Sequence, residues 1–472
     1  MIHELRRYTS TKHSGLSWLD EIPSHWDVRR NGRLFAQRNQ TGYPELPILE
    51  VSLKTGVRVR DFDNSTRKQV MSDRDKYKRA ESGDIAYNMM RMWQGAVGVV
   101  PEDGLVSPAY VVARPYPETD SRYFNYLFRT GAYMGEVDNC SHGIVKDRNR
   151  LYWDDFKQIP SVFPPPDEQA SIVCFLDHFG RRINRLIRAK QKLIKLLEEQ
   201  KQAIIHRAVT RGLDPNVRLK HSGVEWLGEV PEHWEVKKLK WLASFNPSRA
   251  GAAKDLLPDD EVAFLPMERV GTDGQIDTSE SRRVSEVWQG FSYFRRHDVV
   301  LAKITPCFEN GKGAYLGDLP TTHGFGTTEF IVLRARKQVD PEHLYLITTL
   351  QKLRTLGAEN MTGAAGQQRV STDFLRHFMV PVPPVNEQRS ILLALSAATE
   401  EIQKVLTRTS REIALVREYR TRLIADVVTG KLDVREAAAR LPAEEFGELE
   451  EGEGMAENEE VEGAAEEESA DG

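Results

Sequence analysis

Two long stretches of the chain carry apolar residues at alternating steps of four and three positions. They begin after the prolines of Pro164–Gln169 and Pro383–Gln388 and run without proline to Gly212 and Gly430. The positions that follow this rhythm are Ile172, Leu176, Phe179, Ile183, Leu186, Lys190, Leu193 and Leu197 in the first stretch and Ile391, Leu395, Ala398, Ile402, Val405, Thr409, Glu412 and Val416 in the second. This heptad pattern predicts two coiled-coil helices that end near the two glycines.

The two predicted helices are expected to pack on each other. One heptad seam alone would suit any bundle or partner helix, but two matched seams in one chain pair most simply with each other. Lys190 and Thr409 stand at the same seam position, 219 residues apart, where a polar residue fixes the register of an apolar stripe. Because the repeats run head to tail, a two-fold relation between them makes the helix pair antiparallel.

The regions before each helix read as mixed α/β domains with many short strands. We expect helical patches at 121–133 and 341–356, each after the last strand of its region. The expected strands lie at 48–53, 84–87, 95–100 and 109–113 in the first region, and at 261–265, 298–302 and 329–333 in the second. The fold class is therefore α+β, with two tandem mixed domains separated by the two long helices.

A block at the start of each region repeats almost intact. Lys12–Trp26 returns as Lys220–Trp234, and it carries two tryptophans and two histidines in each copy. The tryptophans, which stand beside leucine, isoleucine or valine, and proline, are predicted to anchor packing; they are Trp18, Trp26, Trp226 and Trp234. No cysteine or acid stands at ligand spacing from the histidines, so we expect no metal site. Residues common to both copies belong to the frame, so any difference in recognition must come from the parts that do not repeat.

Composition adds a basic body and an acidic tail. The net charge is −5, but Ala443–Gly472 contains thirteen Glu, one Asp and no Lys or Arg, which leaves residues 1–442 at +9. The basic body favours a polyanionic partner, and the tail reads as a solvating disordered segment, with shielding of the basic surface as the alternative. Three scattered cysteines and the absence of a signal or membrane-spanning run indicate a protein of the reducing cytoplasm, with no membrane partner.

Side chains able to read base edges or hold phosphates occur in the parts that do not repeat. The candidates in the first region are Arg58, Arg60, Lys76, Lys78, Arg79, Arg91, Gln94, Lys146, Arg148 and Arg150. The candidates in the second region are Arg282, Arg283, Lys303, Asn310, Lys312, Gln367, Gln368 and Arg369. The Gly-rich, amide-rich stretch Thr362–Arg369 is the best single loop. Any one of these basic residues alone is more typical of a solvated surface charge than of a DNA contact.

Catalytic signatures are weak. The acid-x-Lys tripeptides at 235–237 and 155–157 resemble fragments of metal-dependent nucleases, but such tripeptides are common by chance. No Asn-Pro-Pro-Tyr or Asp-Pro-Pro-Tyr occurs for base methylation, and no Gly-rich nucleotide loop of the required form. We therefore expect no catalytic residue and no cofactor in this chain. The alternatives are a self-contained nuclease or methyltransferase, and a coiled-coil adaptor that reads no sequence.

The paired Ser-Gly-x-x-Trp-Leu-x-x-x-Pro-x-x-Trp blocks, the paired Pro-Pro-x-x-Glu-Gln helix starts and the Gly83–Gly98 segment resemble the DNA specificity subunit of type I restriction-modification systems. The resemblance covers residues 12–432. It implies target recognition domains at 1–163 and 213–382, spacer helices at 164–212 and 383–432, and a tail at 433–472.

The same resemblance implies a role in defence against foreign DNA. Each domain would read one half of a bipartite duplex site, and the helices would dock two methyltransferase subunits, with restriction subunits in the full complex. S-adenosylmethionine, ATP and Mg would be bound by those partners. The residues expected on the helix seam or at partner contacts are Ile172, Leu176, Ile183, Leu186, Leu193, Leu197, Ile391, Leu395, Ile402 and Val416.

Overall fold

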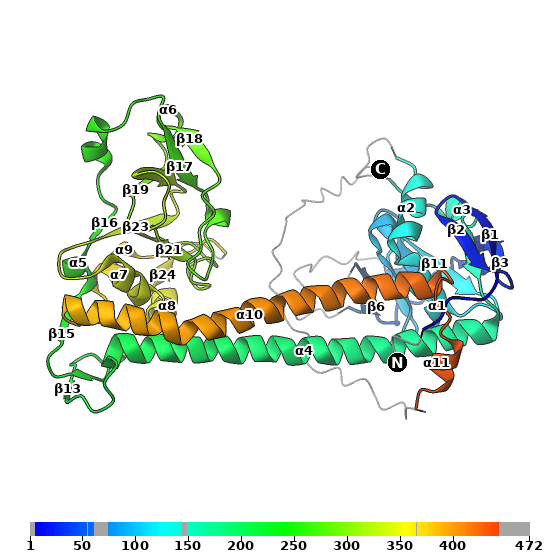
Figure 1. The fold of residues 1–472 in the computed structure, drawn as a ribbon. Helices are drawn as coiled ribbons and strands as arrows, with labels where there is room; N and C mark the ends of the chain where they lie inside the picture. Colours follow the sequence, from blue (N-terminus) through cyan, green and yellow to red (C-terminus); the bar gives the residue numbers. More distant parts are fainter. Residues whose placement is uncertain (1–4, 54, 61–73, 144–148, 365, 443–472) are drawn as a thin grey trace. The chain divides into compact units, whose positions relative to one another are not determined.

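The computed structural model describes residues 5–53, 55–60, 74–143, 149–364 and 366–442. The chain forms two compact units (Figure 1): unit 1 comprises residues 1–184 and 417–472, and unit 2 comprises residues 185–416. The boundaries fall inside the two long helices, α4 (Pro166–Arg211) and α10 (Val385–Val428). Each long helix therefore contributes to both units, and both helices end next to the predicted glycines.

Unit 1 is built on a four-stranded antiparallel sheet. Its strands in spatial order are β4 (Phe35–Arg38), β11 (Tyr110–Pro115), β8 (Ile85–Asn88) and β9 (Val97–Val99). Side chains of successive residues face opposite sides of a strand, and here both sides are covered. Tyr87 and Val111 join the aromatic core beneath the helices, whereas Ala86 and Val112 join a second cluster with Leu49. The uninterrupted apolar runs of these strands thus reflect burial on both faces.

Smaller elements complete unit 1. The two-stranded pairs are β1 (Thr11–Leu16) with β2 (Leu19–Pro23), β3 (Asp27–Arg30) with β12 (Pro160–Phe163), β5 (Leu49–Ser52) with β6 (Gly56–Val59), and β7 (Lys78–Ala80) with β10 (Gly104–Val106). The short helices are η2 (Asn31–Arg33), η3 (Arg74–Lys76), η4 (Met92–Gln94), α1 (Ser121–Phe128), α2 (Gly131–Asn139), α3 (Trp153–Phe156) and α11 (Arg435–Ala439). The β5–β6 hairpin covers the sheet face opposite the helices.

Unit 2 repeats the first sheet and adds a second. The repeated sheet has the order β16 (Ala243–Phe245), β23 (Phe330–Ala335), β20 (Val299–Ala302) and β21 (Gly313–Tyr315). The added sheet has the order β18 (Ser281–Arg283), β17 (Glu261–Leu265), β22 (His323–Gly326) and β19 (Ser292–Arg295). Val300 and Val332 of the first sheet pack with Leu265 and Phe294 of the second. The added sheet is thus packed against the face that the β5–β6 hairpin covers in unit 1.

The remaining elements of unit 2 follow the order of unit 1. The strand pairs are β13 (Leu219–His221) with β14 (Glu229–Pro231), β15 (Glu235–Lys238) with β26 (Met379–Val382), and β24 (Met361–Thr362) with β25 (Arg369–Val370). The short helices are α5 (Leu239–Leu242), η6 (Arg249–Lys254), η7 (Met267–Arg269), α6 (Val284–Val287), α7 (Pro341–Thr348), α8 (Gln351–Glu359) and α9 (Thr372–His377). The prediction of mixed α+β domains with two long helices is confirmed.

We predicted one helical stretch after the last sheet strand of each domain, at 121–133 and at 341–356. In the structure each of these stretches is divided between two helices. In unit 1 the break lies at Arg129 and Thr130, and the Thr130 hydroxyl accepts a hydrogen bond from the backbone N–H of Tyr133. A threonine in this position satisfies an otherwise free N–H and starts a new helix. In unit 2 the corresponding break lies at Thr349 and Leu350. The apolar pattern runs through both breaks, so it did not reveal them.

The seam between α4 and α10 follows a different phase from the predicted one. Leu186 and Leu193, both predicted for the seam, lie on the exposed side with 44% and 43% of their surface accessible. The neighbouring Ile187 is buried at 8% and Ile194 is half-buried. The same shift of one residue appears in α10, where Leu406 is buried and Val405 is exposed.

One additional step of four near the start of each helix causes this shift. The buried and half-buried positions run from Leu176 to Gly180 in α4 and from Leu395 to Thr399 in α10, whereas the predicted pattern took a step of three. Such an insertion in a heptad pattern moves the seam around the helix. Ala398, also predicted for the seam, is exposed, whereas the remaining predicted seam positions, including Ile183 and Ile391, are buried or half-buried.

The helices pair antiparallel within each unit. In unit 2 the Lys190 ammonium lies 2.6 Å from the Glu412 carboxylate, and the Lys201 ammonium donates to the side-chain oxygen of Gln403 at 2.8 Å. The residue number rises along α4 as it falls along α10, which defines the direction. In unit 1 the ring of Phe179 packs on the ring of Tyr419.

The repeated tryptophan block packs on the ends of the long helices. Trp26 is fully buried against Gly430, which follows α10, and Trp234 is fully buried against Gly212, which follows α4. Both glycines have positive φ, 77° and 75°, so a side chain there would be strained as well as crowded. The prediction that these tryptophans anchor packing is confirmed. Trp18 and Trp226 are half-buried against the same two cores.

The repeated Glu-Gln pair at each helix start has a structural role. The Gln169 side-chain oxygen accepts from the backbone N–H of Asp120 at 2.9 Å, and the Gln388 oxygen accepts from Asp340 at 2.7 Å. These two aspartates cap α1 and α7. Glu168 lies 2.7 Å from His25, and Glu387 lies 2.8 Å from His233. Each helix start is therefore bonded to its own domain by one buried amide and one carboxylate.

Candidate nucleic-acid interface

In each unit, two loops from distant parts of the sequence meet at one end of the central sheet. One loop follows β8 or β20, and the other follows α2 or α8. In unit 1 the backbone N–H of Leu151 donates to the Met89 carbonyl at 2.9 Å, and in unit 2 that of Val370 donates to the Lys303 carbonyl at 2.8 Å. We call the end of the sheet where these two loops meet the loop edge. The equivalent bonds show that it lies at the same place in both units.

The loop edge of unit 2 brings several predicted residues together. The stretch from Thr362 to Arg369 is a hairpin loop closed by β24 and β25. Its Gln368 carbonyl accepts from the Thr305 backbone N–H at 2.9 Å, which joins the hairpin to the 303–312 loop. Asn310 and Gln367 are exposed, whereas Lys303 and Gln368 are half-buried. Lys312 turns inward, with its ammonium 3.3 Å from the Met267 carbonyl.

Arg369 is held by a carboxylate at this edge. Its Nε lies 3.2 Å and 3.0 Å from the two Glu329 oxygens, and its Nη2 lies 2.7 Å from one of them. The hydrogen bond from Arg369 lowers the pKa of Glu329, so both partners are charged at neutral pH. Glu329 was not among the predicted residues, because a single acid before a strand carries no signal in the sequence.

The loop edge of unit 1 contains Arg91, Gln94 and Arg150. Gln94 is exposed in η4, and Arg91, which precedes η4, is half-buried. Arg150 is exposed and pairs through its backbone with His142, as Arg369 pairs with Thr362. Lys146 and Arg148 lie outside the described residues. The equivalence of the two loops could have been predicted from Gly143 and Gly363, which follow the second helix of each domain at the same spacing.

Two predicted residues on β7 are engaged within the domain. The Lys78 ammonium donates to the carbonyls of Pro108 and Tyr110 at 2.9 Å and 2.7 Å, and burial lowers its pKa. The Arg79 guanidinium lies 3.0 Å from Asp103 and 3.2 Å from Glu81. These contacts tie β7 to its neighbours, so neither cation presents all of its donors to a ligand.

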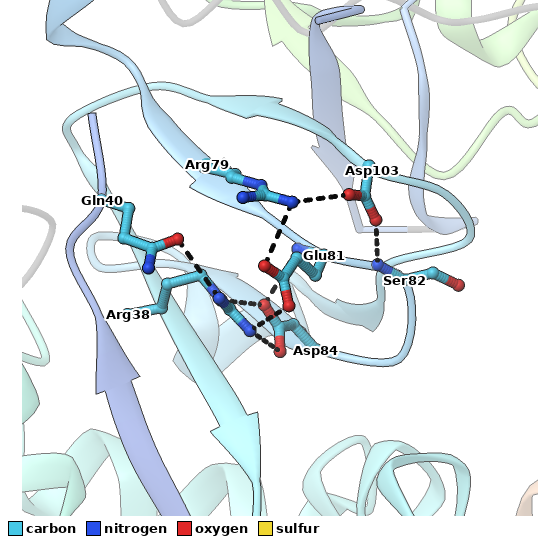
Figure 2. A network of polar contacts seen from close by, with 7 residues as sticks. All are labelled: Arg38, Gln40, Arg79, Glu81, Ser82, Asp84 and Asp103. Atoms are coloured by element: carbon cyan, nitrogen blue, oxygen red, sulfur yellow. Dashed lines mark hydrogen bonds and ion pairs between the residues drawn. The ribbon is translucent and has the colours of Figure 1, made fainter. Parts of the chain in front are cut away.

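Arg79 belongs to the network of charges drawn in Figure 2. At its centre Arg38, only 7% of whose surface is exposed, donates to Asp84 and to Glu81, each at 2.7 Å. Glu81 thus lies between the two arginines. Three carboxylates, counting Asp103, face two guanidinium groups, so most of the charge is balanced within the network, although Arg79 Nε has no acceptor among the described residues. The network joins the end of β4, where Arg38 lies, to β7, which contains Arg79, and to the start of β8, which follows Asp84.

The other predicted residues are distributed around the domains. In unit 1, Arg58 on β6 pairs with Glu50 at 2.5 Å, Arg60 is half-buried and Lys76 is exposed. In unit 2, Arg282 lies over the Phe264 ring at 3.8 Å and pairs with Glu280 at 2.8 Å. The adjacent Arg283 is exposed. Arg282 and Arg283 lie on β18, at an edge of the added sheet, rather than in the hairpin and loop around Arg369.

Two features bear on other ligand classes. Within the described ranges, no three His, Cys, Asp or Glu side chains gather to hold a metal ion. No helix of the described part of the chain is apolar over enough residues to cross a lipid bilayer.

Comparison with known proteins points to one family. Residues 231–412 match the model of the type I restriction modification DNA specificity domain. Two specificity subunits from Escherichia coli are similar to this chain: that of type I restriction enzyme EcoEI is 32% identical over 206 residues, and that of EcoAI is 34% identical over 168 residues. These alignments cover 43% and 35% of this chain, but only 33% and 28% of the two relatives.

A solved structure supports the fold. A chain from a structural study of complex assembly and conformational transition of the type I R-M system aligns with 87% of this chain and 99% of its own length. The TM-score is 0.62 at 14% sequence identity. The two chains therefore have the same fold.

Proposed function

We propose that this chain is the DNA-reading subunit of a type I restriction-modification system, because residues 231–412 match the DNA specificity domain of that family. Residues 1–163 and 213–382 each read one half of a bipartite duplex site. The spacer helices at 164–212 and 383–432 dock two methyltransferase subunits, and restriction subunits join the full complex. The complex works in the cytoplasm.

One observation carries this proposal. The repeated frame, which consists of the tryptophan blocks and the starts of the long helices, is equivalent in both units, whereas the loop edges differ. The frame is equivalent in both units, down to the Gln169 and Gln388 amides that bond the helix starts to their domains. The loop edges are built on equivalent backbone bonds but carry different side chains: Arg91, Gln94 and Arg150 in one, and Asn310, Gln367 and Arg369 in the other. Two loop edges with different side chains on equivalent domains are expected to bind two half-sites of different sequence.

The residue types at these edges suit direct base readout. Arginine donates two hydrogen bonds to guanine, and asparagine or glutamine pairs with adenine, both in the major groove. Exposed cations away from the edges, such as Arg283, suit the phosphate backbone, which positions the protein without specifying sequence. Lys78 and Arg79 contribute less to either task, since their donors are engaged within the domain.

We assign the chemistry to the partner subunits. The chain carries no sequence motif for base methylation or nucleotide binding. In this proposal S-adenosylmethionine, ATP and Mg are bound by the methyltransferase and restriction subunits, and this chain supplies recognition and assembly. We assign no catalytic residue to it.

The test is selection of bound duplexes from a random DNA library by the purified full chain. Two short enriched motifs separated by a fixed gap of unspecified sequence are expected. Binding is expected to weaken steeply with salt, because several phosphates are neutralised. A replicate with the cognate methyltransferase subunits is expected to enrich the same motifs.

Three results would overturn the proposal. A single uninterrupted motif would contradict the bipartite site. Enrichment of no sequence, with binding indifferent to salt, would indicate a coiled-coil adaptor. Cleavage of DNA by the chain alone with a divalent metal, or methylation by it with S-adenosylmethionine, would indicate a self-contained enzyme.

A further inference from the structure

The Glu329–Arg369 pair at the loop edge of unit 2 leaves one side of the guanidinium available. Arginine has five N–H groups in a rigid planar fork. The Nε N–H and one Nη2 N–H point to the Glu329 carboxylate, and Nη1 donates to the Gln367 carbonyl at 3.2 Å. One N–H on each terminal nitrogen then remains without an acceptor among the residues that the structure describes.

These two remaining groups lie on the two terminal nitrogens, one on each. The two terminal nitrogens form the end of the fork, which is the part of an arginine that can pair with two acceptors at once. The Arg369 side chain is 42% exposed, and the side chain of its partner Glu329 is 24% exposed. The carboxylate therefore fixes the orientation of the plane and leaves its outer end accessible.

Unit 1 lacks this arrangement at the equivalent position. The Lys303 backbone N–H donates to the Glu329 carbonyl at 2.9 Å, and the Met89 N–H donates to the Ala109 carbonyl at 3.4 Å, so Ala109 stands where Glu329 stands. Arg150, at the position of Arg369, is exposed, and no described side chain pairs with its guanidinium. Among the described residues, the carboxylate clamp is thus present in unit 2 alone.

We propose that Arg369, positioned by Glu329, reads a guanine in the half-site of unit 2. This inference rests on the proposed DNA-reading function. Guanine presents O6 and N7 as two parallel acceptors in the major groove, and arginine is the side chain that pairs with both. Glu329 offsets the positive charge of the arginine, which weakens its attraction to phosphates and leaves geometry to select the base. Glu329 is a positioning residue, and Arg369 determines specificity.

The experiment repeats the duplex selection with four variants of the full chain. R369A is expected to lose the preference for guanine at one base pair by roughly tenfold to hundredfold, with the other half-site unchanged. R369K is expected to lose most of the same preference, because an ammonium group cannot form the fork. R336A, which alters an exposed arginine of unit 2 outside both the loop edge and the long helices, is the matched control and is expected to retain every preference.

E329A gives unit 2 the residue that unit 1 has at this position and distinguishes positioning from simple hairpin stability. The freed guanidinium is expected to attract phosphate, so the slope of log K against log salt becomes steeper by about 0.9, while the guanine preference falls. A purely structural clamp would lower the melting temperature and weaken binding to all sequences without changing the base preference or the slope.

The outcomes separate this inference from the proposed function. If the wild-type chain enriches two half-sites and R369A and R369K retain every base preference, the guanine contact is wrong and the DNA-reading function stands. If the wild-type chain enriches no sequence, both are wrong. If R369A does not fold, R369K and E329A decide the inference by the same readouts.

Discussion

The Lys190 ammonium lies 2.6 Å from the Glu412 carboxylate, and this pair joins α4 to α10 within unit 2. Both side chains are only partly exposed. The pair stands among apolar seam residues, where an ion pair fixes which residues of the two helices face each other. The register it defines places Ile187 in the seam and leaves the adjacent Leu186 outside it.

Two double variants test this register. Replacing Ile187 and Ile194 with glutamate is expected to destabilise the helix pair by at least about 3 kcal/mol, because two charges enter an apolar seam. Replacing Leu186 and Leu193 with glutamate is expected to change stability by less than about 1 kcal/mol. Circular dichroism during thermal unfolding measures both. Equal losses in the two variants would contradict the observed phase.

The exposed leucines also test the proposed docking of partners. If methyltransferase subunits bind α4, the Leu186 and Leu193 double variant is expected to fold and yet lose assembly, measured as stoichiometry by light scattering. An unchanged complex would place the docking surface elsewhere on the chain.

The two buried tryptophans predict unequal effects of the same substitution. The Trp234 indole N–H donates to Glu387 at 3.1 Å, whereas that of Trp26 has no hydrogen-bond acceptor among the described residues. Changing tryptophan to phenylalanine removes similar apolar volume at both positions. We therefore expect Trp234→Phe to cost about 1.5 to 3 kcal/mol more than Trp26→Phe, the value of a hydrogen bond to a charged group. Differential scanning calorimetry of the two variants measures this, and equal costs would contradict it.

His343 predicts a loss of stability in acid. It is fully buried in α7, neither ring nitrogen has a partner among the described residues, and burial lowers its pKa from 6.5 to about 4. Between these values the unfolded chain binds a proton that the folded chain does not, so stability is complete above about pH 6.5 and falls toward pH 4. The loss is roughly 3 kcal/mol at pH 4.

His343→Leu is expected to remove this part of the acid dependence. Urea unfolding at pH 7.5 and at pH 5 measures the effect, and His142→Gln, which alters a histidine with a largely exposed side chain, is the control. An acid dependence that survives in His343→Leu would show that other groups cause it.

The contrast between engaged and exposed cations predicts different salt dependences for DNA binding. Arg283→Ala is expected to reduce the slope of log K against log salt by about 0.9, as expected for one lost phosphate contact. Arg79→Ala is expected to leave the slope unchanged and to lower the melting temperature, because Asp103 and Glu81 lose their partner. The opposite pattern would reverse the assignment of these two residues.

The sequence predicts the frame well because its signals are local. Proline runs, the two terminal glycines and heptad spacing mark the long helices, and uninterrupted apolar runs mark the sheet strands. The phase of the seam was not predictable, because apolar residues occur in adjacent pairs such as Leu186–Ile187 and Leu193–Ile194. Each member of a pair fits a heptad, and only the packing in the structure selects one.

The candidate site was predictable in outline and not in detail. The loops around Arg91 and Arg369 could be found from their residue types, but which cations remain accessible depends on contacts across long sequence separations. Lys78 binds carbonyls some thirty residues away, and Glu329 meets Arg369 forty residues later. No spacing rule supplies such pairs, because they arise from the order of strands in the sheet.

The composition of unit 1 from both ends of the chain has a consequence for folding during synthesis. Unit 2 is one continuous segment, residues 185–416, whereas the core of unit 1 includes Leu423 and Val427 of α10, and the Tyr123 hydroxyl donates to the Val428 carbonyl at 2.9 Å. A ribosome releases those residues only after the whole of unit 2. The half of the protein that is translated first is therefore completed last, and its exposed apolar surface must remain soluble until the second half has emerged.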